Sequence, residues 1–167
     1  MKIQIQIDPL DIMILSSVEK YKSEVIGLLF GNQVFKKYNI KMALPLVTAE
    51  TTFTVADYNL NRVKRVITLY PELTNKKRKF LGFYHSHTQY GDIKAIPQMS
   101  DVDKESFIHT EDAKLEIILV INDYQRYVEW AENEDGTISG TCGNYHVKIA
   151  GYIKQKDKII RTHVSYY

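Results

Sequence analysis

The sequence predicts a mixed α/β fold in which helices flank one central mixed β-sheet. Strand-like and helix-like segments alternate over the first two thirds of the chain, and only strand-like segments follow. The chain has 167 residues, of which 44% are hydrophobic and 25% charged, as in ordinary globular proteins. We therefore expect residues 1–167 to form a single domain.

The N-terminal segments predict a strand followed by a helix. Residues 2–7 alternate polar and apolar side chains, which is typical of a strand. Asp8 and Pro9 then supply an N-cap and a first-turn proline for a helix. The expected helix reaches Tyr21, because apolar residues recur at helical spacing: Leu10, Met13, Ile14, Val18 and Tyr21.

The middle of the chain predicts a hairpin, a second helix and a further strand. A buried strand from Glu24 to Phe30 should lead through a turn at Gly31-Asn32 into strand structure over residues 34–47. Helical periodicity returns from Ala56 to Tyr70, and a strand from Phe80 to His87 follows. The apolar face of this second helix consists of Leu60, Val63, Ile67 and Tyr70.

The last part predicts a short helix and then mainly strands. Residues 88–99 read as irregular, Ser100 begins a short helix, and residues 114–121 are a strongly apolar strand. The Asp135-Gly136 pair predicts a turn. Further β segments are expected over residues 125–131, 145–154 and 158–166.

Composition excludes several classes of function. The net charge is only +2, so the chain has no large field of one sign to bind nucleic acid or an anionic membrane. The most apolar runs are far shorter than the roughly 20 residues that span a bilayer, and the N-terminus lacks a signal-peptide core. The single cysteine, Cys142, excludes an internal disulfide and favours a reducing, cytoplasmic location.

Three short runs of the chain fit one zinc site. His85 and His87 are two apart in a predicted strand, so both imidazoles project from the same face. Asp103 lies three residues after Ser100 at a helix start, which places its carboxylate near the Ser100 hydroxyl. Two imidazoles and a carboxylate leave one position of a tetrahedral zinc for water, and Glu24 could accept that water's proton.

Each run also has a structural interpretation. A His-x-His pair arises by chance in chains of this size, and Ser100 with Asp103 is also the pattern of a helix capping box. Glu24 could be the exposed start of an apolar strand. The combination of the three runs favours the metal site.

The same runs resemble those of the JAMM (MPN+) metalloprotease family. The run from Glu24 to Gly31, the later His-Ser-His and then Ser-x-x-Asp match the family in order and in type. The glutamate run is similar to that of proteasome-lid and signalosome deubiquitinases, with glycines three and seven residues after the acid. The resemblance covers Met1 to Ile121 and implies a deaminase-like mixed sheet between helices.

The resemblance also implies roles for these residues. It makes His85, His87 and Asp103 the ligands of Zn²⁺ and Glu24 the general acid/base, while Ser100 stabilises the oxyanion. It implies hydrolysis of isopeptide or peptide bonds after the C-terminal glycine of ubiquitin or a ubiquitin-like protein. The alternatives are a peptidase that processes a sulfur-carrier-like protein or a small peptide, and a catalytically silent scaffold that binds partner subunits.

The chain departs from the family between the second histidine and the serine. Residues 88–99 make twelve, where the family usually has seven, and Thr88 replaces a common proline. Asp92 and Asp101 are therefore rival ligands, although only Asp103 keeps the serine spacing. His109, His146 and His163 match no motif. An extended substrate tail is expected to bind near this loop as an added strand, with the carrier protein seated on Leu60 and Val63.

Overall fold

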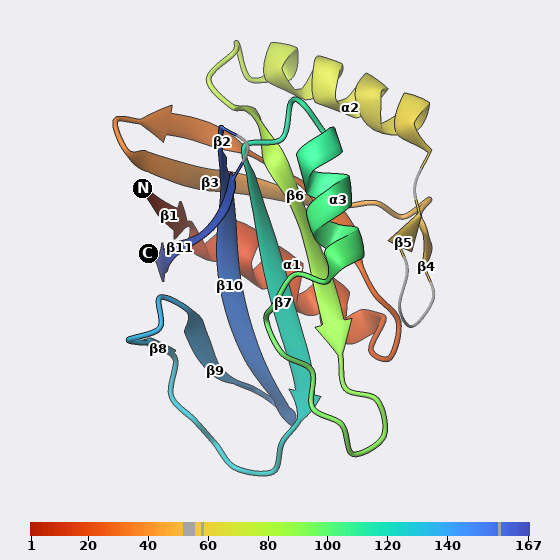
Figure 1. Ribbon diagram of the computed structural model, residues 1–167, viewed down its shortest axis with the longest axis vertical. Helices are drawn as coiled ribbons and strands as arrows, with labels where there is room; N and C mark the ends of the chain where they lie inside the picture. Colours follow the sequence, from red (N-terminus) through yellow and green to blue (C-terminus); the bar gives the residue numbers. More distant parts are fainter. Residues whose placement is uncertain (52–55, 58, 157) are drawn as a thin grey trace.

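The computed structural model describes residues 1–51, 56–57, 59–156 and 158–167, and it has the predicted alternation of strands and helices (Figure 1). In chain order the elements are β1 (Lys2–Ile5), α1 (Ile7–Glu19), β2 (Ile26–Val34), β3 (Lys37–Pro45), β4 (Glu50–Thr51), β5 (Ala56–Asp57), α2 (Leu60–Leu73), β6 (Lys79–Thr88), α3 (Asp101–His109), β7 (Leu115–Asp123), β8 (Ala131–Glu132), β9 (Ile138–Cys142), β10 (Tyr145–Gln155) and β11 (Lys158–Tyr166).

The described strands form one large mixed sheet and a small hairpin of β4 with β5. The large sheet has the order β11-β1-β3-β2-β6-β7-β10-β9-β8, and β11 also pairs with β10. The strands from β11 round to β10 therefore close into a ring. β1 is parallel to both of its neighbours and β6 is parallel to β7, whereas the other pairs are antiparallel. The predicted mixed α/β class is confirmed, and the closure is a feature that the sequence did not predict.

Helices cover both faces of this sheet (Figure 1). One core forms beneath α1, where Leu10, Met13 and Ile14 pack against apolar side chains of β1, β3, β7 and β10. A second core forms beneath α2 and α3, where Val63 and Phe107 pack against β2, β6 and β10. Because side chains alternate along a strand, each central strand contributes to both cores.

Several predicted boundaries near the N-terminus were wrong, since β1 ends at Ile5 and α1 at Glu19, each two residues short of its expected end. Gln6 is the N-cap of α1, and Asp8 already lies in its first turn, where a carboxylate interacts favourably with the helix dipole. The hairpin turn is at Phe35-Lys36 rather than at Gly31-Asn32, because Val34 pairs with Lys37. Gly31 instead lies at a bulge, where an added Cβ would be 1.9 Å from the carbonyl oxygen of Asn39.

The second helix begins later than the sequence predicted. Asn59 caps α2 by accepting a hydrogen bond from the backbone N–H of Arg62 at 3.2 Å. Residues 56–57 belong to β5 instead, and residue 58 of the expected helix lies outside the described residues. Within the predicted apolar face Val63 is buried, whereas Leu60 is exposed.

The predicted C-terminal strands were partly wrong. Only Ala131 of the expected segment 125–131 enters a strand, β8, and the strand β9 was missed. Gly140 in β9 lies beneath the Trp130 ring, since an added Cβ would be 2.5 Å from that ring. The turn at Asp135-Gly136 and the two last strands are confirmed. Among the described residues, no helix has the length and apolar character needed to cross a bilayer.

We predict that Gly82→Ala destabilises the fold strongly. Gly82 has a positive φ of 154°, and an added Cβ would lie 1.7 Å from the carbonyl oxygen of Leu115 on the neighbouring strand β7. The clash should lower the free energy of unfolding by about 3 kcal/mol, measured by urea denaturation. Gly143→Ala is the control, because Gly143 also has positive φ but open space around it, and it should cost only about 1 kcal/mol. Equal losses in the two variants would contradict the role of this close approach.

Candidate metal centre

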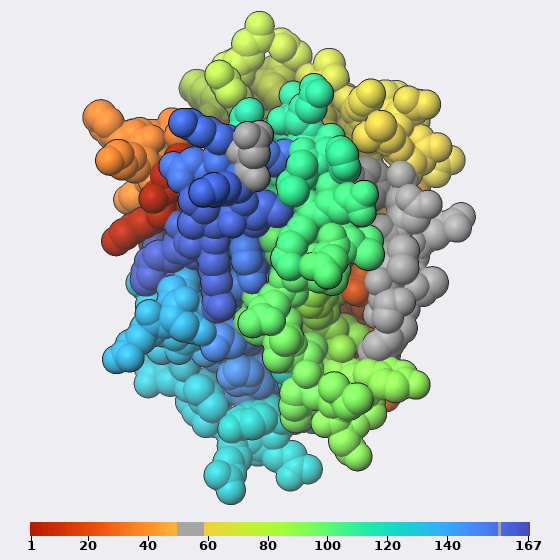
Figure 2. Space-filling view, viewed as in Figure 1, coloured from red at the N-terminus to blue at the C-terminus, as the bar shows by residue number. Residues whose placement is uncertain are grey.

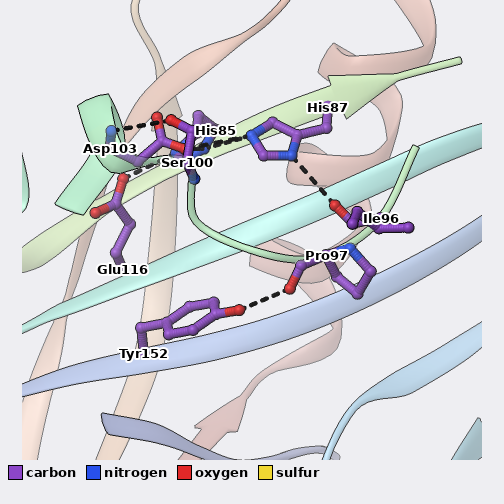
Figure 3. Close-up of polar contacts among 8 residues, drawn as sticks. All are labelled: His85, His87, Ile96, Pro97, Ser100, Asp103, Glu116 and Tyr152. Atoms are coloured by element: carbon purple, nitrogen blue, oxygen red, sulfur yellow. Dashed lines mark hydrogen bonds and ion pairs between the residues drawn. The ribbon is translucent and has the colours of Figure 1, made fainter. Parts of the chain in front are cut away.

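The strand β6 and the helix α3 bring three potential ligands together (Figure 3). His85 and His87 project from the same face of β6, and their Nε2 atoms are 3.0 Å apart. Asp103, in the first turn of α3, places its Oδ2 atom 3.7 Å from the Nε2 of His85 and 3.6 Å from that of His87. In the part of the chain that the structure describes, these residues form the one group of at least three side chains spaced to hold a metal ion.

The donor atoms fit a metal ion of zinc size. Bonds of about 2.0–2.1 Å to a tetrahedral ion place ligand atoms roughly 3.3–3.4 Å apart, close to the three observed distances. The Nδ1 atoms of both histidines face oxygen acceptors, so each Nδ1 can donate its proton there while each Nε2 is left to bind a metal ion. Three potential ligand atoms therefore converge on one point, where a metal ion would replace the proton that the imidazoles otherwise share with Asp103.

Glu116 orients His85, and the sequence prediction missed it. The Nδ1 of His85 donates to the Oε1 of Glu116 at 2.8 Å, and the two residues are 5% and 8% exposed. Glu116 lies on β7, one strand away from β6. Such a carboxylate fixes the ring and makes Nε2 a stronger ligand. The available signal was the single charged residue inside the apolar run from Leu115 to Ile121.

Backbone groups orient the other two ligands. The Nδ1 of His87 donates to the carbonyl oxygen of Ile96 at 3.3 Å (Figure 3). Ser100 and Asp103 form a capping box, in which the Ser100 N–H donates to Asp103 Oδ2 at 2.7 Å and the Asp103 N–H donates to Ser100 Oγ at 3.1 Å. Asp103 can therefore cap the helix and bind a metal ion at the same time, since the Oδ2 atom that accepts the Ser100 N–H also faces both imidazoles.

Glu24 lies just before β2 and borders the same cavity. The neighbouring Val25 is fixed to β6 by two hydrogen bonds of 2.9 Å, from its N–H to Ser86 Oγ and from the Ser86 N–H to its carbonyl oxygen. Ser86, the residue between the two histidines, therefore connects the Glu24 segment to the strand that carries them. Glu24, His87, Ser100 and Asp103 all line one cavity of about 680 Å³.

The charges at this centre favour a cation. Burial favours the neutral His85 ring, but hydrogen bonds and charges from Asp103 and Glu116 outweigh it and raise its pKa to about 10. Burial would raise the pKa of Asp103, but hydrogen bonds from the two histidines hold it well below its usual range. Burial also raises the pKa of Glu24, and the histidines oppose this shift. The carboxylates of Asp103, Glu116 and Glu24 therefore lie around the two imidazoles, and their negative charge favours a bound cation.

The rival ligands lie outside this cluster. Asp92 is exposed in the loop, and Asp101 forms an ion pair with Lys104 at 2.8 Å. Neither joins the metal-spaced group of the described chain, and nor do His109, His146 and His163. The metal-binding and catalytic roles of the five named residues remain predictions.

The model of the JAB1/Mov34/MPN/PAD-1 ubiquitin protease family matches residues 3–113, which include the whole metal centre except Glu116. The chain belongs to this family, which includes metalloisopeptidases. No curated protein matches the chain. The solution structure of protein DSY2949 from Desulfitobacterium hafniense is similar over 99% of this chain and 92% of its own, with a TM-score of 0.60 and 14% identity, which shows a shared fold alone.

We predict that Glu116→Gln weakens zinc binding about 10- to 100-fold, because the variant loses the carboxylate that orients His85 and strengthens it as a ligand. Competition with a chromophoric chelator measures the Kd. Glu105→Gln is the matched control, since Glu105 is exposed on α3 and should leave the affinity unchanged. An unchanged Kd for Glu116→Gln would show that Glu116 is only a core contact.

Proposed function

We propose that this chain is a zinc-dependent isopeptidase or peptidase that cleaves after the C-terminal glycine of ubiquitin or a ubiquitin-like protein. The observation that carries the proposal is the convergence of His85, His87 and Asp103 on one point, with Glu24 on the wall of the same cavity. The metal fits three protein ligands with one position left for water, which is the arrangement of catalytic rather than structural zinc sites.

Each residue has a separate part in this chemistry. When bound, zinc lowers the pKa of a coordinated water to about 7 and polarises the scissile carbonyl. Glu24 accepts the proton of the attacking water and passes it to the departing amine. Ser100 Oγ accepts a hydrogen bond from the Asp103 N–H, so its own proton can be donated to the oxyanion that forms on the scissile carbonyl.

The position of Glu24 supports this assignment. A carboxylate at the end of an apolar strand is costly to bury without a partner, and here the Ser86 hydrogen bonds to the adjacent Val25 hold the Glu24 segment beside the histidines. Burial raises its pKa, which brings it closer to the range in which one group can both accept and release a proton.

A substrate-carrier site on α2 would involve fewer residues than the sequence suggested. Val63 is buried in the core and cannot contact a bound protein, whereas Leu60 remains exposed. The alternative of a silent scaffold is less well supported, because all three ligands and their orienting partners are present. The cytoplasmic location, the partner subunits and the identity of the carrier remain proposals.

Metal content tests the centre directly. We expect near-stoichiometric zinc in the purified protein by elemental analysis, and strongly reduced zinc in His87→Ala and Asp103→Ala, because each variant removes one of three ligands. Glu24→Gln should retain its zinc, since Glu24 is not in the ligand group. A protein that stays free of zinc even after reconstitution would favour the silent scaffold.

Activity tests the role of Glu24. Zinc-loaded protein should release the extension from ubiquitin-like proteins that carry a peptide after their last glycine, detected by mass spectrometry. Glu24→Gln should slow this release about 10²- to 10⁴-fold, because it removes the general acid/base. Cys142→Ser is the control, because the exposed Cys142 takes no part in the mechanism. Loss of activity in Cys142→Ser with full activity in Glu24→Gln would refute the assignment.

A further inference from the structure

The lengthened loop of residues 88–99 is firmly attached to the rest of the fold. Tyr90 and Ile93 exchange two backbone hydrogen bonds of 3.1 and 2.9 Å around a tight Gly91-Asp92 turn, where Gly91 has a positive φ of 54°. The Ala95 N–H donates to Asn122 Oδ1 at 2.9 Å at the end of β7. The loop therefore has its own turn and an attachment to the sheet.

Its second half is attached beside the metal centre. The hydroxyl of Tyr152 on β10 donates to the carbonyl oxygen of Pro97 at 2.7 Å, and the adjacent Ile96 carbonyl accepts from His87 (Figure 3). Neighbouring residues of the loop are thus bound to the sheet on one side and to a metal ligand on the other. The loop is therefore held in place along one side of the metal centre.

The loop and the start of α3 present apolar side chains to solvent. Ile93, Ile96 and Tyr90 of the loop are 71%, 58% and 65% exposed, and Val102 in the first turn of α3 is 73% exposed. All four line the cavity that also contains Glu24, His87 and Asp103. We call these four residues the apolar wall. Exposed apolar side chains held in one place beside a candidate active site are typical of a binding surface.

The charged groups of the cavity are already engaged. The Lys94 ammonium donates to Gln89 Oε1 at 2.8 Å and to the Asp123 carbonyl oxygen at 2.7 Å. Glu24 and Asp103 belong to the catalytic arrangement. Apart from the neutral polar side chains of Thr88, Gln98 and Ser100, the surface left to recognise a substrate is therefore mainly the apolar wall, which selects for apolar side chains.

We propose that the apolar wall is a subsite for a large aliphatic or aromatic side chain of the polypeptide substrate, immediately after the bond that is cleaved. This inference rests on the proposed function, in which the residue before the scissile bond is glycine and has no side chain to bind. The side chain nearest to the scissile bond then belongs to the departing segment. Substrates with a linear extension that begins with an apolar residue fit best.

Binding of two matched peptides to the zinc-loaded Glu24→Gln protein tests this subsite without turnover. Both probes are fluorescein-labelled hexapeptides that begin with Gly-Gly, followed in one by Leu and in the other by Asp, with the same last three residues. Fluorescence anisotropy should show the Leu peptide binding at least tenfold tighter, because only its side chain gains from burial against the wall. Equal affinities, or no detectable binding of the Leu peptide, would overturn the inference.

A second substitution tests whether the apolar wall causes the preference for the Leu peptide. Added to Glu24→Gln, Ile93→Ser should weaken the Leu peptide about tenfold and leave the Asp peptide unchanged. Leu73→Ser is the matched control, because Leu73 is also 71% exposed and belongs to α2, which lies at the opposite end of the molecule from the loop (Figure 1). The loop appears in Figure 2 as the light-green lobe below α3. Because it lies on the surface, the fold should tolerate Ile93→Ser. An unaltered preference in Ile93→Ser would refute the wall as its source.

Cleavage of the same peptides by the wild-type protein separates the two hypotheses. Equal cleavage of both peptides would support the proposed hydrolase and reject the apolar subsite. Tight, Ile93-dependent binding of the Leu peptide, together with no cleavage of ubiquitin-like proteins that carry a peptide after their last glycine, would support the subsite and reject the hydrolase.

Discussion

The parallel pairing of β6 with β7 is the constraint on which the metal centre depends. This register sets Phe83 beside Glu116 and His85 beside Ile118, so the carboxylate lies diagonally across from the ring that it orients. A slip of one residue would turn Glu116 to the α1 face and leave a carboxylate in an apolar core. The close approach of Gly82 to the backbone of Leu115 helps to fix the register, because no other residue fits there.

The helix α3 completes the centre because both of its ends are fixed. Phe107 is buried beneath it, and Lys154 of β10 donates to the carbonyl oxygens of Ile108 and Thr110 at 3.1 and 2.8 Å. At the other end, the capping box holds the Asp103 carboxylate toward the histidines. Capping and ligation therefore use one side chain, so the structural and the functional interpretations of Ser-x-x-Asp do not exclude each other.

Features that depend on local sequence patterns were predicted better than contacts between residues that lie far apart in the sequence. Apart from the small hairpin of β4 with β5, the order of strands and helices up to β7 followed from periodicity, and His85 with His87 followed from the two-residue repeat of a strand. Glu116 could not be paired from the sequence, because its partner lies 31 residues away and depends on register. The strand β9 was missed because Gly140 and small residues hide its alternation, and that glycine is required by Trp130. The attachment of the long loop likewise depends on Asn122 and Tyr152, which no local motif identifies.

The closure of the sheet has a consequence for how the chain folds. Ile3 pairs with Val164, so the ring is complete only when segments from opposite ends of the sequence meet. Contacts of such high sequence separation form slowly, because the intervening chain must lose its freedom first. The metal centre instead draws on β2, β6, α3 and β7, which follow one another over a shorter stretch. We therefore expect the pairing of β1 with β11 to form late in folding, after the elements of the metal centre have come together.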